Sequence, residues 1–334
     1  MAKRPAPHPP SSILHLRPVL ITGPSAVGKS EIALQLAEQV GGEIISADSM
    51  QVYRGLDIGT AKPSPAERAR APHHLIDILE LTESFDAAQF TRRAHRAAAE
   101  IQSRGRRPIV CGGTGLYLRA FLEGLGETPP ADPRLRAELE ALPLETLLTE
   151  LREHDPATHA TIDRRNPRRV IRAVEVIRLT GKPFSEQKSR WGETRSNPNS
   201  TADENKSEPD GVPPHRTGFF CLTRQADDLR RRIDARVDAM FARGLVEETR
   251  ELLRHGLEQN RTAMQAIGYR QVVEHLHGDR PLAATIELVK IRTRQFAKRQ
   301  LTWFRRQKNL EWIELNPETT PEHAARKIGV HFQK

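Results

Sequence analysis

The sequence predicts an α/β fold in which helices cover both faces of a parallel sheet and a helical insertion domain interrupts the chain. Short apolar runs alternate with helical patterns over the first 127 residues, and glycines separate them. From about residue 128 the pattern becomes helical and poor in strands, and an apolar run returns at 218–222. Alternation of strands and helices is typical of a parallel sheet.

The first strand leads into a glycine-rich loop. The apolar run 19–21 is followed by Gly23, Pro24, Ser25, Ala26, Val27, Gly28, Lys29 and Ser30, and a helical pattern begins directly after them. Gly-x-x-x-x-Gly-Lys-Ser between a strand and a helix is a P-loop, so the sheet is predicted to be P-loop NTPase-like. Backbone amides, the helix N-terminus and Lys29 would bind a diphosphate, and the Ser30 hydroxyl would ligate Mg²⁺.

The remaining strands predict one acidic and one hydroxyl group near this loop. Strands are expected at 43–48, 74–78, 108–111 and 218–222. Asp48 ends the second strand, and Thr114 follows the fourth after two glycines. Ligands of open parallel sheets bind at the carboxyl ends of the strands, so Asp48 and Thr114 should face the P-loop.

Composition sets the domain boundaries and the expected environment. We expect a disordered tail at 1–17, a P-loop core with C-terminal helices at 18–127 and 217–315, a helical insertion domain at 128–190 and a low-complexity loop at 191–216. The 334 residues are 37% hydrophobic and 28% charged, and no apolar run approaches the roughly 18 residues that span a membrane. The two distant cysteines indicate neither a disulfide framework nor a zinc site, so a reducing, cytoplasmic setting is expected. We also expect a monomer without membrane contact.

Two basic clusters indicate a nucleic-acid partner. The net charge is +9, and eight basic residues with no acid lie between 290 and 308, interleaved with Phe296, Trp303 and Phe304. A second group of arginines lies between 164 and 178. Basic stripes bind phosphate backbones, and nearby aromatic rings can stack on unpaired bases.

The motifs leave more than one reaction open. A P-loop kinase or NTPase of small molecules is one alternative, although no acid follows the best buried strand after the P-loop helix to hold Mg²⁺. A non-catalytic RNA-binding module with a vestigial P-loop is another. A single acid beside a diphosphate site suits a reaction in which diphosphate leaves and a weak nucleophile loses a proton.

Several longer motifs resemble the tRNA dimethylallyltransferase (isopentenyl-tRNA transferase) family. They are the P-loop, the segments 46–63 and 72–77, the Gly-Gly-Thr-Gly-Leu-Tyr run at 112–117, and the segments 266–270 and 298–305. They follow the order of the family from about residue 19 to 306. One departure is Gly115, which stands where the family often has a larger apolar residue.

The resemblance implies a reaction and its residues. A dimethylallyl group would pass from dimethylallyl diphosphate to N6 of the adenosine 3′ to the anticodon, in the anticodon stem-loop of tRNA, with Mg²⁺ assisting. Asp48, Thr114 and Lys29 would be catalytic, and the P-loop residues and Arg224 would bind diphosphate. The residues implied to contact tRNA are Asp48, Ser49, Met50, Gln51, Thr114, Arg136, Arg168, Arg169, Val170, Ile171, Arg172, Gln265, Ala266, Ile267, Gly268, Tyr269, Arg270, Lys298, Arg299, Gln300, Leu301, Thr302, Trp303, Phe304 and Arg305.

Overall fold

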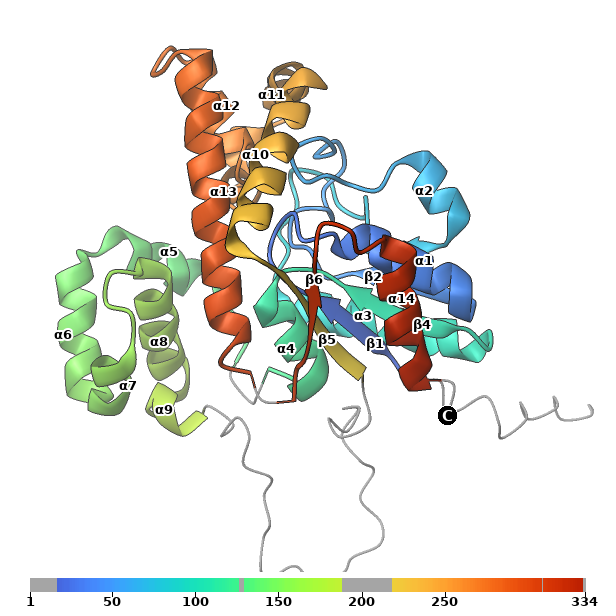
Figure 1. Ribbon diagram of the computed structural model, residues 1–334. Coiled ribbons are helices and arrows are strands. Elements are labelled where there is room, and N and C mark those ends of the chain that lie inside the picture. Colours follow the sequence, from blue (N-terminus) through green and yellow to red (C-terminus); the bar gives the residue numbers. More distant parts are fainter. Residues whose placement is uncertain (1–16, 126–128, 188–217, 308, 333–334) are drawn as a thin grey trace, which may run out of the picture. The chain divides into compact units, whose positions relative to one another are not determined.

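The structure is a computed structural model that describes residues 17–125, 129–187, 218–307 and 309–332 (Figure 1). Within these ranges the chain forms two compact units, one of residues 17–122 with 218–332 and one of residues 123–187. The low-complexity loop expected at 191–216, and the expected tail apart from residue 17, lie outside the described residues. Among the described helices, none combines the length and the apolar character that a membrane crossing requires.

The first unit contains a six-stranded parallel sheet, so the predicted fold class is confirmed. The strands lie in the order β3-β2-β4-β1-β5-β6, and every pair of neighbours is parallel. Their bounds are β1 Val19–Thr22, β2 Gly42–Ser46, β3 His73–His74, β4 Arg107–Cys111, β5 Gly218–Arg224 and β6 Glu311–Leu315. Strands β1, β2, β4 and β5 lie where the apolar runs predicted them.

Helices cover both faces of this sheet, because the side chains of each strand point alternately to two hydrophobic cores. Leu20, Ile45 and Val110 belong to one core, whereas Ile21 and Ile109 belong to the other. The helices of this unit are α1 Lys29–Val40, α2 Pro65–Arg70, α3 Ala87–Ser103, α4 Gly115–Glu123, α10 Ala226–Ala242, α11 Leu245–Arg254, α12 Tyr269–Leu276, α13 Leu282–Phe304 and α14 Pro321–Gly329.

Two parts of the core differ from the expectation. The third strand was predicted at 74–78 but comprises only β3, because Leu75 and Asp77 have positive φ angles of 62° and 54°, which end an extended strand. The core also continues beyond the predicted boundary at 315. Helix α14 contributes Ala324, Ala325 and Ile328 to the same hydrophobic core as α1.

Within the described residues, all regular secondary structure of the second unit is helical. Its helices are α5 Pro133–Ala141, α6 Leu144–His154, α7 Pro156–Thr161, α8 Pro167–Thr180 and α9 Phe184–Gln187, and they surround a core that includes Leu139, Leu147, Leu151, Val170 and Val174. The Asn166 side chain caps the N-terminus of α8 by accepting from Arg169 N–H, and Gly181 ends the helix in a left-handed conformation.

Candidate active site and nucleic-acid surface

The P-loop connects β1 to α1 and has the backbone of an anion-binding loop. Gly23 has a φ of 143°, and a Cβ at this position would lie 2.5 Å from the carbonyl oxygen of Leu222, so only glycine fits. No side chain caps the N-terminus of α1. The first amides of this helix are therefore available to an anion, and the helix dipole favours one.

Lys29 lies within this loop with its charge only partly satisfied. Its Nζ donates to the carbonyl oxygen of Pro24 at 2.8 Å. Burial lowers the pKa of Lys29 to about 8. The positive charge of nearby Arg236 adds to this shift, and the negative charge of Asp48 opposes it. A bound anion would favour the protonated form, so Lys29 is suited to bind one.

Asp48 and Thr114 lie at the carboxyl ends of neighbouring strands β2 and β4, as predicted. Asp48 Oδ1 accepts from Met50 N–H at 2.8 Å, and Thr114 Oγ1 accepts from Ser49 N–H at 3.3 Å. The two segments touch because Gly112 has no side chain: a Cβ there would lie 2.2 Å from the carbonyl oxygen of Ala47. The structure thus brings the predicted acid, hydroxyl and lysine to one edge of the sheet.

Three arginines approach the loop from β5 and α10, and two of them, Arg232 and Arg236, were not predicted from the sequence. Arg232 Nε donates to Ala26 O at 3.0 Å. Burial lowers the pKa of Arg236, and the charge of Asp48 opposes this shift. The two residues are four apart on one helix directly after a strand. This spacing places both on the same face of α10 and could have revealed them.

Arg224, the arginine that was predicted, is held mainly by the protein itself. Its Nε donates to Val27 O at 3.0 Å, and its Nη1 contacts Asp228 at 2.9 Å and the carbonyl oxygen of Asn316 at 3.0 Å. Arg224 therefore stabilises the P-loop backbone through Val27. Its Nη2 lies near Gly28, 4.0 Å from the position that a Cβ on this glycine would occupy.

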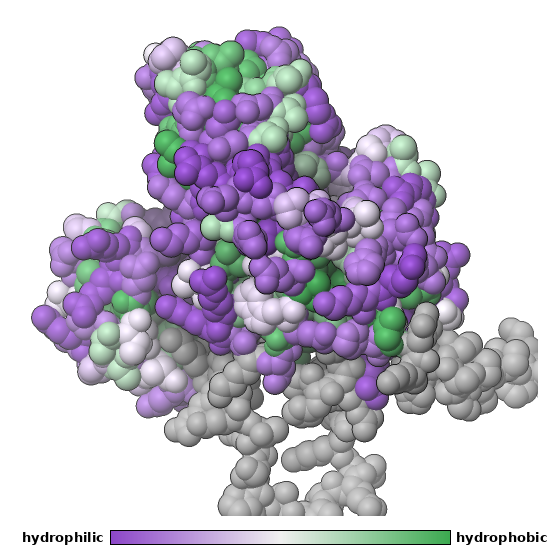
Figure 2. Space-filling model, in the orientation of Figure 1, coloured by the Kyte–Doolittle hydropathy of each residue, from purple (hydrophilic) through white to green (hydrophobic). Residues whose placement is uncertain are grey.

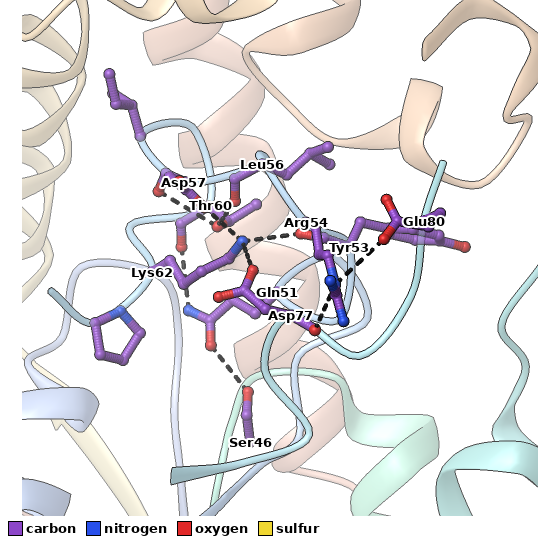
Figure 3. A network of polar contacts seen from close by, with 12 residues as sticks. Ser46, Gln51, Tyr53, Arg54, Leu56, Asp57, Thr60, Lys62, Asp77 and Glu80 are labelled. Carbon is purple, nitrogen blue, oxygen red and sulfur yellow. Dashed lines mark hydrogen bonds and ion pairs between the residues drawn. The ribbon is translucent and has the colours of Figure 1, made fainter. Parts of the chain in front are cut away.

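The segment after Asp48 is fixed by a buried polar network (Figure 3). The side chain of Lys62 is 1% exposed, and its Nζ lies 2.5 Å from both Asp57 and Asp77 and 2.8 Å from Tyr53 O. Gln51 is also buried, accepting from Ser46 Oγ at 2.9 Å and donating to Thr60 O at 3.3 Å. The Gln51 side chain, which was predicted to belong to the tRNA-binding residues, thus holds the segment that carries Asp48.

The outer face of α13 carries the predicted basic residues. Lys298, Arg299, Thr302 and Arg305 are exposed. All of these except Arg305 line an open groove of about 420 Å³. Its lining residues are Gln295, Lys298, Arg299, Thr302, Trp303 and Arg306. Figure 2 shows that the surface of the first unit on this face is mostly hydrophilic.

The inner face of α13 contains residues that were predicted to contact tRNA but are buried. Phe304 is fully buried and Gln300 is 7% exposed, so these side chains face the protein interior rather than RNA. Gly115 is explained here as well, because a Cβ at this position would lie 2.5 Å from the Trp303 ring. Trp303 thus occupies the space that a larger residue at position 115 would need.

The segment 265–270, which was also predicted to contact tRNA, contains both exposed and buried residues. Gln265 and Arg270 are exposed, whereas Ala266, Gly268 and Tyr269 are buried. The Tyr269 hydroxyl donates to Glu248 at 2.6 Å and accepts from Gly59 N–H at 3.0 Å, and burial raises the pKa of Tyr269. Ala266, Gly268 and Tyr269 are therefore not accessible on the surface, and only Gln265 and Arg270 of this segment have exposed side chains available to tRNA.

Of the residues predicted to contact tRNA in the second unit, Arg168 and Arg169 are exposed, whereas Val170 and Ile171 are buried in its core. Arg136 and Arg172 instead neutralise a carboxylate, that of Glu175, which is 0% exposed; their guanidinium groups lie 2.5 and 2.7 Å from its Oε2. Partially exposed as they are, these two arginines have a structural task that the sequence did not reveal.

Comparisons with known proteins agree on one family. A family model described as IPP transferase matches residues 51–307. Curated tRNA dimethylallyltransferases resemble the chain over most of their length. One from Trichlorobacter lovleyi is 45% identical and the match covers 92% of this chain and 97% of the relative, and one from Geobacter metallireducens is 45% identical and covers 89% and 92%.

Solved structures give the same answer. The tRNA isopentenylpyrophosphate transferase of Bacillus halodurans is 37% identical with a TM-score of 0.66, and the match covers 95% of this chain and 96% of the other. A eukaryotic dimethylallyltransferase, whose structures show it acting on tRNA, is 28% identical with a TM-score of 0.75 and coverage of 94% and 78%.

Proposed function

Because the chain belongs to the IPP transferase family, we propose that it transfers the dimethylallyl group of dimethylallyl diphosphate to N6 of the adenosine 3′ to the anticodon of tRNA and releases diphosphate. The observation that carries this proposal is the placement of Asp48 and Thr114 beside a P-loop whose Lys29 has a lowered pKa. The site therefore offers an anion-binding loop and a base, which are the two components that this reaction requires.

The chemistry follows from these groups. The adenine N6 attacks the allylic carbon, the C–O bond to diphosphate breaks with its electron pair leaving on oxygen, and the proton of the exocyclic amine passes to the Asp48 carboxylate. An amine of this kind is a poor nucleophile, so a carboxylate that accepts its proton has a clear task. Met50 N–H orients that carboxylate through Oδ1, and Thr114 would orient the amine or the bridging oxygen.

The leaving group is stabilised by positive charge from two directions. The amides of the P-loop and Lys29 face it from one side, and Arg232 and Arg236 approach from α10. Donors fixed before the reaction lower the cost of the charge that develops on the departing oxygens.

The residues present fit a bound Mg²⁺, which prefers oxygen ligands and keeps several waters. Ser30 at the N-terminus of α1 offers a hydroxyl beside the anion site. Within the described ranges no group of three or more His, Cys, Asp or Glu side chains could hold a metal, so phosphate oxygens would supply most ligands. When bound, Mg²⁺ would neutralise charge on the diphosphate.

The tRNA would contact the exposed residues of the predicted set, namely Arg168, Arg169, Gln265, Arg270, Lys298, Arg299, Thr302 and Arg305. To reach the pocket the target base must unstack, at a cost of a few kcal/mol. We further propose that the protein acts in the cytoplasm as a monomer. Both of its cysteines are free thiols, which fits a reducing compartment, and light scattering would test the oligomeric state.

The test is incubation of the purified protein with labelled dimethylallyl diphosphate and unmodified tRNA. We expect label in the tRNA, recovered after digestion as N6-(dimethylallyl)adenosine, with one diphosphate released per transfer. A parallel reaction with ATP examines the kinase or NTPase alternative. Phosphate release from ATP without transfer of label would refute the proposed function.

A further inference from the structure

Gln300 lies where three parts of the site meet. It is on α13, on the buried stripe that also includes Ala297 and Phe304, and these positions, three and four residues apart, share one face of the helix. The basic residues of the predicted RNA surface lie on the exposed positions of the same helix. The side chain of Gln300 therefore points into the core unit, toward the loops that follow β1 and β4.

Its amide connects these two loops. Gln300 Oε1 accepts from Ser25 N–H at 2.9 Å, and Gln300 Nε2 donates to Gly113 O at 2.9 Å. Only this orientation of the amide satisfies both partners, since Ser25 N–H can only donate and Gly113 O can only accept. Ser25 Oγ lies 3.4 Å from the same Oε1.

The connection continues to the proposed catalytic groups. Gly113 precedes Thr114, whose hydroxyl accepts from Ser49 N–H next to Asp48. The fit at Gly113 is tight, because a Cβ there would lie 2.3 Å from Gln300 Nε2. Gln300 thereby fixes the separation between the anion-binding loop and the segment that carries Thr114.

We propose that Gln300 is a positioning residue that holds the P-loop and the Gly113–Thr114 segment in the geometry that binds diphosphate and aligns the reacting groups, and that it does not contact tRNA. This inference rests on the proposed function for its catalytic part. Its binding part depends only on the anion site. A glutamine is suited to the task because it donates and accepts through one planar amide without placing a charge beside the leaving group.

The test replaces the amide by an apolar side chain of similar length. In Gln300→Met both hydrogen bonds are lost, and we expect the dissociation constant for inorganic pyrophosphate, measured by calorimetry without tRNA, to rise about tenfold. The KM for dimethylallyl diphosphate should rise in parallel and kcat should fall, while the dissociation constant for tRNA stays within about twofold. Gln89→Met is the matched control, because Gln89 lies on α3 and its amide donates to Ser84 O, away from the P-loop; it should change none of these values.

A second pair of variants separates positioning from simple loss of stability. Gly113→Ala should force Gln300 away and weaken pyrophosphate binding to a similar extent. Because Gln300→Ala frees the space, the double variant Gly113→Ala with Gln300→Ala should bind no more weakly than Gln300→Ala alone. The melting temperature of each variant shows that it is folded under the conditions of the assay.

The outcomes distinguish the two levels of the argument. Three results would each overturn the role of Gln300 and leave the proposed function intact. They are unchanged pyrophosphate affinity in Gln300→Met, losses of pyrophosphate affinity in the position 113 and 300 variants that add in the double variant, and a loss confined to tRNA affinity. Wild-type protein that fails to bind pyrophosphate would overturn both.

Discussion

Raising the pH from 7 to 9 should weaken the binding of inorganic pyrophosphate through deprotonation of Lys29. Burial lowers the pKa of this ammonium to about 8 in the free protein. The charged fraction then falls from about nine-tenths at pH 7 to about one-tenth at pH 9, which is an affinity loss of about tenfold if only the ammonium binds.

The sign of the linked proton follows from the same shift. The pyrophosphate anion stabilises the ammonium, so the pKa of Lys29 rises above 8 in the complex, and binding near pH 8 should take up about half a proton per ligand. Calorimetry in buffers with different ionisation enthalpies, at constant Mg²⁺ concentration, measures this uptake directly.

The Lys29→Met variant is the control, because it retains only the titration of pyrophosphate itself. Subtracting its pH dependence from that of the wild type isolates the contribution of Lys29. The same pH dependence in both proteins, or binding that tightens between pH 7 and 9 in the wild type alone, would refute the assignment of Lys29 to the anion.

Three other predictions concern the surroundings of the site. Lys62→Met leaves two carboxylates without their buried partner and should cost about 3 kcal/mol in urea unfolding. Arg96→Met removes an exposed ion pair with Glu100 outside the network and should cost less than about 1 kcal/mol; equal losses would contradict the structural role of the network. Glu175→Gln removes the buried charge between two arginines and should lower the melting temperature of the second unit, and an unchanged value would show that this carboxylate is not needed there. In Lys298→Ala with Arg305→Ala, the salt dependence of log Kd for tRNA should become shallower by about 1 to 2, and an unchanged slope would remove these residues from the RNA surface.

Much of the fold followed from local signals in the sequence. The apolar runs that became β1, β2, β4 and β5 are buried on both faces, which is why they stand out without alternation. The P-loop was identified because strand, glycines and helix occur together. Glycines mark the ends of α1 and α8, because Gly41 and Gly181 adopt the left-handed conformation that terminates a helix.

Strand β6 was missed because its residues are mostly exposed, so the segment 311–315 shows only two buried apolar positions, Ile313 and Leu315. Helix α14 follows β6. Its place in the hydrophobic core depends on packing against α1, which is distant in the sequence and could not be predicted. The order of the strands was likewise beyond the sequence, because pairing between β1 and β5 joins segments nearly 200 residues apart.

The site residues also differ in whether local sequence signals could place them. Residues that directly follow strands, such as Asp48 and Thr114, could be placed from the strand ends alone. The burial of Gln51, Tyr269 and Gln300 could not, because motifs similar in sequence do not separate residues that touch a substrate from residues that hold the loops. Arg236 lies outside every motif used; its spacing of four from Arg232 places both on one face of α10, and the contact of Arg232 with Ala26 shows that this face lies toward the P-loop.

The most direct test of the account is the single-turnover rate of dimethylallyl transfer to tRNA by the Asp48→Ala variant, with both substrates saturating. Loss of the proton acceptor should slow the transfer by about 10² to 10⁴-fold. The dissociation constants for tRNA and pyrophosphate should remain within a few-fold of the wild type, since the P-loop and the outer face of α13 are unchanged. A transfer rate close to that of the wild type, or a loss of tRNA binding large enough to explain the whole effect, would contradict the role of Asp48 as the base.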